Sequence, residues 1–118
     1  MSAAKINLPV IEQGATYRHT LYWRDIDGLP INLSACTAKM QIRATVDSSA
    51  VVCELSTANE RIILTDAEGK IEFAVPSSIT KVLKPMTAVY DLEITFDTGD
   101  VVRLIEGSVA VKAEVTRG

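Results

Sequence analysis

The chain has 118 residues, and its 12 Lys and Arg against 15 Asp and Glu give a net charge of −3. A chain of this length forms one domain and buries about two-thirds of its surface on folding. We therefore expect a single domain over residues 1–118, with residues 1–5 as an N-terminal tail. The acidic balance argues against a nucleic-acid partner, and a hydrophobic content of 47% argues against disorder.

The sequence also argues against a membrane partner. No apolar stretch approaches the roughly 18 residues that a membrane-spanning helix needs. The first five residues, Met-Ser-Ala-Ala-Lys, lack the apolar core of a secretion signal. We expect the chain to be synthesised in a cytoplasm.

The dominant pattern is alternation of apolar and polar residues with a period of two, which is typical of β-strands. The 12 Val, 11 Ile and 11 Thr supply the β-branched side chains that strands favour. In residues 16–24, Tyr17, His19, Leu21 and Trp23 share one face. The other predicted strands cover residues 36–44, 51–55, 71–75, 88–96, 102–104 and 109–115. About seven strands with one polar face each predict an all-β, immunoglobulin-like antiparallel β-sandwich.

Acidic, glycine-containing stretches separate the strands. Residues 25–28, 66–69 and 97–100 each combine Asp with Gly and predict hairpin turns. Gly107 lies instead within a long apolar run. The core-facing positions are even-numbered before it and odd-numbered after it, so we expect a β-bulge at Gly107.

One short helical turn is predicted from Ser77 to Leu83, between two prolines. Ser77 or Ser78 can cap it, and Ile79, Val82 and Leu83 share its apolar face.

Tyr90 precedes the core position Leu92 by two residues. This spacing matches the tyrosine corner of immunoglobulin-like domains, where a tyrosine hydroxyl bonds to the backbone a few residues upstream. A ligand-binding tyrosine is the alternative, which we favour less.

Candidate chemical groups are few. His19 is the single histidine and lies on an apolar face, so a core or boundary position explains it better than metal binding or catalysis. Cys36 and Cys53 also fall on apolar faces, in no zinc or redox spacing, and we expect free thiols.

The acidic turns allow a calcium site only weakly, because no twelve-residue calcium loop is present. The four aspartates concerned are Asp25, Asp27, Asp97 and Asp100. Nucleophile and nucleotide-binding motifs are also missing. We expect no enzyme activity, no cofactor and no metal.

Short motifs along most of the chain carry a family resemblance. They are Gln13-Gly14-Ala15, Trp23-Arg24-Asp25, Asp27-Gly28-Leu29-Pro30-Ile31-Asn32-Leu33, Met40-Gln41-Ile42-Arg43, Gly69-Lys70-Ile71, Ser77-Ser78-Ile79-Thr80, Val89-Tyr90-Asp91-Leu92-Glu93, Gly107-Ser108-Val109 and Val115-Thr116-Arg117. In these motifs the chain resembles small bacteriophage virion proteins with an immunoglobulin-like sandwich. It is similar to the N-terminal domains of phage baseplate and fibre-anchoring proteins.

The resemblance implies a structural subunit of the tail tip, baseplate or fibre attachment, located in the virion. Its partners would be other virion proteins, with this chain present as a homo-oligomer or in several copies. A capsid decoration or neck subunit, and a module that binds host carbohydrate, are the alternatives. Apolar, aromatic or charged positions on polar faces are the candidate interface residues: Tyr22, Arg24, Val52 and Val89.

Overall fold

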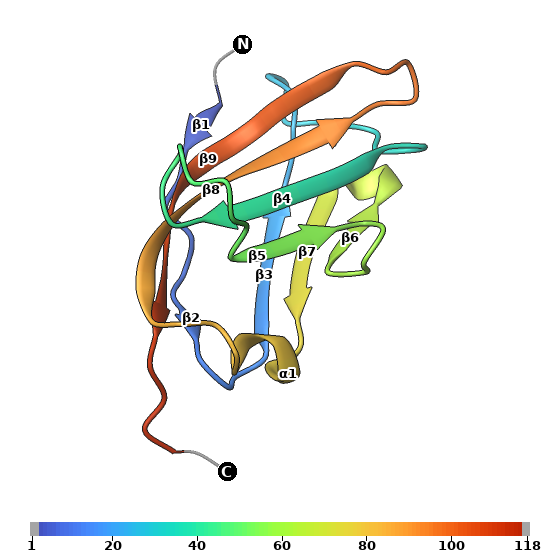
Figure 1. Ribbon diagram of the computed structural model, residues 1–118. Coiled ribbons are helices and arrows are strands. Elements are labelled where there is room, and N and C mark those ends of the chain that lie inside the picture. The colour runs from blue at the N-terminus through green and yellow to red at the C-terminus, as the bar shows by residue number, and fades with distance from the viewer. Residues whose placement is uncertain (1–2, 117–118) are drawn as a thin grey trace.

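The computed structural model describes residues 3–116 and shows two β-sheets packed face to face (Figure 1). The larger sheet has the strand order β1 (Ala4–Lys5), β9 (Val101–Lys112), β8 (Met86–Thr95), β4 (Thr37–Arg43) and β5 (Cys53–Ser56), and β2 (Ile11–Glu12) also pairs with β9. The smaller sheet has the order β3 (Tyr17–Tyr22), β7 (Lys70–Val75) and β6 (Ile62–Thr65). The predicted all-β sandwich is confirmed.

The connectivity is that of an immunoglobulin-like sandwich. The second, fifth and fourth strands of such a domain form one sheet, and its third, sixth and seventh strands form the other. The match holds when the two short N-terminal strands are counted together as the first and β5, at the edge of the larger sheet beside β4, is counted as an additional strand. β3, β7 and β6 then occupy the former places, and β4, β8 and β9 the latter. Both N-terminal strands run parallel to β9, whereas the other strand pairs are antiparallel.

The core lies between the sheets and follows the alternation along each strand. On β8, Ala88, Tyr90, Leu92 and Ile94 are buried, and the residues between them are partly exposed. Phe73 of β7 lies opposite them and is among the largest fully buried side chains. Burial of such side chains contributes roughly 1.5–3 kcal/mol each, so this alternation is the main source of stability.

Three strands were not predicted from the sequence. In β6, the run Ile62-Ile63-Leu64 hides the alternation, although Ile62 is buried and Ile63 is exposed. β1 and β2 have two residues each, too short to alternate. The predicted tail at residues 1–5 is therefore wrong for Ala4 and Lys5, while residues 1 and 2 lie outside the described part of the chain.

The predicted turns are confirmed, and the helical turn is shorter than expected. A 3-10 turn, η1 (Asp66–Glu68), occupies one turn, and the helix α1 covers Ser77–Thr80. Pro76 occupies the N-cap without a side-chain hydrogen bond, so neither Ser77 nor Ser78 caps the helix. Leu83 is buried as predicted, whereas Val82 is 69% exposed and does not share the apolar face.

The register change on β9 is confirmed, but its position was predicted wrongly. The pairing with β8 shifts between Leu92 and Glu93, which face Ile105 and Arg103. Leu104 is therefore the extra residue, three positions before Gly107. Gly107 itself pairs regularly with Tyr90.

Gly107 is needed for a close approach of two backbones. A Cβ atom at this position would overlap the carbonyl group of Ile6. The absence of a side chain therefore lets the N-terminal segment (residues 4–12) lie against β9.

Backbone and side-chain hydrogen bonds fix the N-terminal segment in place. The Ile6 and Leu8 amides donate to β9 carbonyls at 2.9 and 3.0 Å. The Tyr90 hydroxyl of the larger sheet donates to the Ile6 carbonyl at 2.6 Å, and the Tyr17 hydroxyl of the smaller sheet donates to the Pro9 carbonyl at 2.9 Å. The N-terminal segment is thus bonded to both sheets.

The Tyr90 bond corrects the predicted tyrosine corner. Its acceptor, Ile6, lies 84 positions away in the chain and not a few residues upstream. The position two residues before the fully buried Leu92 was predicted correctly.

Alkaline pH should destabilise the fold through these two tyrosines. Burial is the main cause that raises the pKa of Tyr17 and of Tyr90 from 10 to about 12. The folded state therefore keeps both protons at a pH where the unfolded chain releases them. This contribution to stability is complete below pH 10 and is lost as the pH rises from 10 through about 12.

Urea unfolding at several pH values measures the effect. Tyr17→Phe and Tyr90→Phe should each lose about 1 kcal/mol at neutral pH, because a hydrogen bond is removed. Each variant should also lose less stability than the natural chain between pH 10 and 12. Parallel curves for all three proteins would contradict this role.

Candidate docking surface

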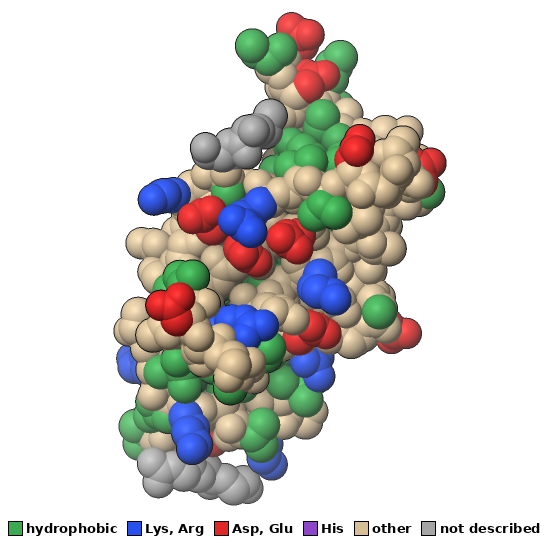
Figure 2. Space-filling view, turned by 45° about the horizontal axis from the view of Figure 1, so that its top comes forward, with side chains coloured by type: hydrophobic (Ala, Val, Ile, Leu, Met, Phe, Trp, Pro, Cys, Tyr) green, Lys and Arg blue, Asp and Glu red, His purple; other side chains and the backbone are tan. Residues whose placement is uncertain are grey.

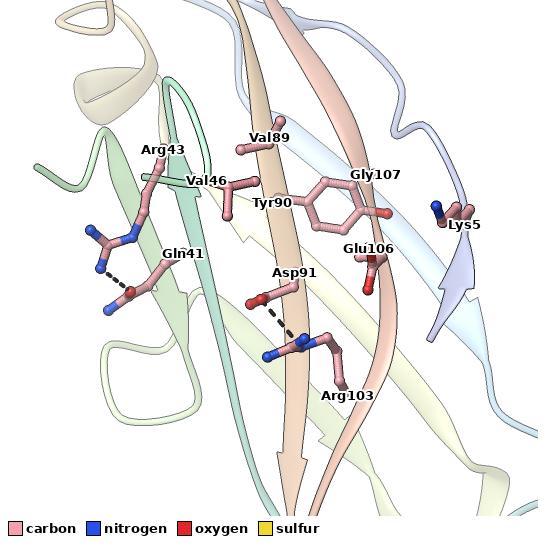
Figure 3. Close-up of a pocket in the computed structure, with 10 residues that line it drawn as sticks. All are labelled: Lys5, Gln41, Arg43, Val46, Val89, Tyr90, Asp91, Arg103, Glu106 and Gly107. Carbon is pink, nitrogen blue, oxygen red and sulfur yellow. Dashed lines mark hydrogen bonds and ion pairs between the residues drawn. The ribbon is translucent and has the colours of Figure 1, made fainter. Parts of the chain in front are cut away.

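A groove of about 420 Å³ crosses the outer face of the larger sheet (Figure 3). Strands β4, β8 and β9 form its floor, β1 forms one edge, and the loop after β4 forms the other. Its lining residues are Lys5, Gln41, Arg43, Val46, Val89, Tyr90, Asp91, Arg103, Glu106 and Gly107. We call this site the outer groove.

The outer groove exists because alternate residues of the strands point away from the core. Val89 and Asp91 lie between core residues of β8 and point outward. The Tyr90 side chain is 4% exposed and belongs to the core. Val46, in the loop after β4, is 82% exposed and adds an apolar surface next to Val89 (Figure 3).

Polar groups of the outer groove bind one another. Arg103 makes ion pairs with Asp91 at 3.4 Å and Glu93 at 3.7 Å. All three side chains are substantially exposed, so each pair stabilises the fold by well under about 1 kcal/mol. The pairs do, however, compensate part of the charge at this end of the groove.

The other two cations that line the outer groove, Arg43 and Lys5, differ from Arg103 in their contacts. The Arg43 guanidinium donates to the Ser48 carbonyl at 2.8 Å and to the Gln41 amide oxygen at 2.7 Å. Both acceptors are neutral, so the positive charge of Arg43 remains available to an incoming carboxylate. Lys5 is exposed across the groove from Arg43 (Figure 3). Val46 and Val89 form an apolar surface beside Arg43, and Glu106, which is opposite Lys5 in the pairing of β1 with β9, lies between that surface and Lys5 (Figure 3).

This arrangement is suited to binding. In residues 3–116, no group of three or more His, Cys, Asp and Glu side chains is placed to hold a metal ion. The carboxylate of Asp91 is occupied by Arg103. The outer groove offers hydrogen-bonding groups, charged groups and an apolar surface.

The four predicted interface residues do not form one surface. Tyr22 is 52% exposed at the end of β3, and the Arg24 guanidinium lies 5.4 Å from its ring centroid. Such a cation–π contact contributes roughly 0.5–1 kcal/mol at an exposed site. Val89 lines the outer groove on the other sheet. Val52 is half-buried and packs against the core.

Other exposed apolar residues were missed. Val46 and Ile26 lie in loops, where sequence periodicity gives no signal, and Ile26 is 100% exposed. The available signal was the triplet Asp25-Ile26-Asp27, an apolar residue in a turn with no strand face to bury it.

The remaining candidate chemical groups support the fold. His19 is half-buried, and its ring centroid lies 6.2 Å from that of Phe73, which confirms a boundary position. Cys36 and Cys53 are free thiols, as predicted, although only Cys53 is fully buried. Burial is the main cause that raises the pKa of the Cys53 thiol, and Arg61 opposes the shift.

Comparison with protein-family models finds no family that matches the chain, and comparison with curated proteins finds no matching relative. The described residues include no helix long and apolar enough to cross a membrane.

Tyr22→Ala and Val52→Ala should differ in their effect on stability. Tyr22 is exposed, so its truncation should cost within about 1 kcal/mol, most of it from the lost contact with Arg24. Val52 packs against the core, and loss of its two methyl groups should cost about 1–1.5 kcal/mol. Urea unfolding measures both values, and a larger loss for Tyr22→Ala would contradict these placements.

Proposed function

We propose that this chain is a structural subunit of a bacteriophage virion, at the tail tip, baseplate or fibre attachment, and that it acts by docking onto neighbouring proteins. The virion assignment is supported by the resemblance of its turn and strand motifs to small phage virion proteins. The role is mechanical, and it needs neither catalysis nor a cofactor.

The observation that carries the docking role is the composition of the outer groove. An apolar centre of Val46 and Val89 lies beside the cation Arg43, and charged side chains line the rest of the groove: Lys5, Asp91, Arg103 and Glu106. Protein interfaces have this organisation, with an apolar centre and a polar rim. Tyr22 and Arg24 supply a second exposed pair of residue types that are enriched in interfaces.

Carbohydrate binding is less favoured by the same groove. Sugar sites on sandwiches use exposed aromatic rings as stacking platforms. The aromatic residue that lines the outer groove is Tyr90, and its ring is buried with its hydroxyl bonded to Ile6. A capsid decoration or neck subunit would use the same docking chemistry, and the two proposals differ in location on the particle.

Immunogold labelling of virions tests the proposal. Particles would be produced by infection, or by induction of the strain that carries the coding sequence, and labelled with an antibody against this chain. We expect label on intact particles, concentrated at the tail tip or baseplate. Particles from a deletion strain serve as the matched control.

Label on the capsid or neck would replace the tail assignment by the decoration alternative. Virions that carry none of this chain, by labelling and by mass spectrometry, would contradict the proposed function.

A further inference from the structure

The structure contains a second surface that complements the outer groove. Residues 25–29, which we call the hairpin tip, follow β3 and connect it towards β4. Ile26 is 100% exposed and Leu29 is 61% exposed, with Asp25 and Asp27 on either side of Ile26. Figure 2 shows the same combination of acidic and hydrophobic side chains, next to one another, at the top end of the molecule.

The hairpin tip is held in shape by its own hydrogen bonds. The Asp25 carboxylate accepts from the Asp27 amide at 2.9 Å and from the Leu29 amide at 3.0 Å. The Asp25 amide donates to the Leu29 carbonyl at 2.8 Å, and Arg24 and Pro30 form a bridge beyond it. Ile26 is therefore presented on an ordered loop, which lowers the entropy cost of binding.

The two surfaces carry opposite charges at Asp27 and Arg43. The remaining charges of the groove oppose one another, because Asp91 pairs with Arg103 and Glu106 lies next to Lys5. In the hairpin tip, an apolar residue lies between two carboxylates. In the outer groove, Val46 and Val89 lie beside Arg43. The acceptors of the Arg43 guanidinium are neutral, so a carboxylate of the tip adds a charge-assisted bond without displacing an ion pair.

The dimensions of the two surfaces also agree. Lys5 and Arg43 lie on the outer two of four adjacent strands, β1, β9, β8 and β4, which are roughly 14 Å apart at the usual strand spacing. A hairpin has two backbones about 5 Å apart, so it fits across this width. The tip follows a strand of the smaller sheet, whereas the groove lies on the outer face of the larger one.

We propose that the hairpin tip of one copy of this chain docks into the outer groove of a second copy, with Ile26 against Val46 and Val89 and with Asp27 facing the cation Arg43. The two contacting surfaces are different, so each copy offers one tip and one groove. Repetition of such a contact closes into a ring or extends as a filament. The inference rests on the proposed docking function of the groove and names its partner.

Sedimentation velocity over a concentration series tests the contact. The contact area of a hairpin tip is small, so association should become measurable at concentrations approaching roughly 1 mM. Ile26→Asp and Val46→Asp should each raise the dissociation constant at least about tenfold, because a carboxylate then faces an apolar surface. Both positions are exposed, and circular dichroism should show an unchanged fold.

Val82→Asp is the matched control. Val82 is exposed after α1, next to the start of β3 and so at the opposite end of that strand from the tip. This variant should associate like the natural chain. A control that weakens association as much as Ile26→Asp would contradict the proposed contact.

Mixing the tip variant Ile26→Asp with the groove variant Val46→Asp tests the contact more specifically. The Ile26→Asp protein keeps an intact groove, and the Val46→Asp protein keeps an intact tip. Together they should form a one-to-one dimer that does not grow, although neither associates alone. A mixture that behaves as the sum of its components, or a natural chain that is monomeric up to about 1 mM, would overturn the inference.

These outcomes are separate from those of virion labelling. A chain that is monomeric in solution but present in virions would remove the self-docking contact and keep the proposed function. A chain that associates through tip and groove but is absent from virions would keep the self-docking contact and contradict the proposed function.

Discussion

Two buried tyrosine hydroxyls, one from each sheet, hold the N-terminal segment in place. Tyr90 donates to the Ile6 carbonyl and Tyr17 donates to the Pro9 carbonyl. Displacement of the segment would leave both hydroxyls without these acceptors, at a cost of roughly 1–3 kcal/mol each. Gly107 permits the approach, because any side chain there would meet Ile6. The sandwich therefore depends, in addition to its apolar core, on the contacts of Ile6 with Tyr90, 84 positions away, and with Gly107.

The same constraint shapes the candidate docking surface. Lys5 belongs to the N-terminal segment and forms one edge of the outer groove. Its position follows from the pairing of β1 with β9, which the Tyr90 bond to Ile6 secures. Arg43 is fixed separately, by its bonds to Gln41 and Ser48. The groove thus has two cations held by independent elements, and this rigidity suits a surface that must accept an ordered partner.

Sequence alternation predicts the sandwich because most strands have one buried and one exposed face. β8 shows this clearly, with Ala88, Tyr90, Leu92 and Ile94 buried. The acceptor of Tyr90 and the role of Gly107 could not be predicted, since both depend on Ile6, which is distant in sequence.

The candidate site was predicted only in part. Val89 lies in the groove, but Val46 and Ile26 lie in loops, where exposure depends on three-dimensional arrangement and not on periodicity. Val52 was expected on a polar face, but it is half-buried and packs against the core.

Amide hydrogen exchange of Ile6 and Leu8 tests most directly whether the N-terminal segment is an integral part of the fold. Both amides donate to β9 carbonyls, so they should exchange as slowly as amides of the β8–β9 pair. In Gly107→Ala, whose added methyl group would meet Ile6, their protection should fall at least about tenfold, while that of β7 changes less. Exchange in the natural chain as fast as that of the exposed turn at residues 97–100 would contradict the account.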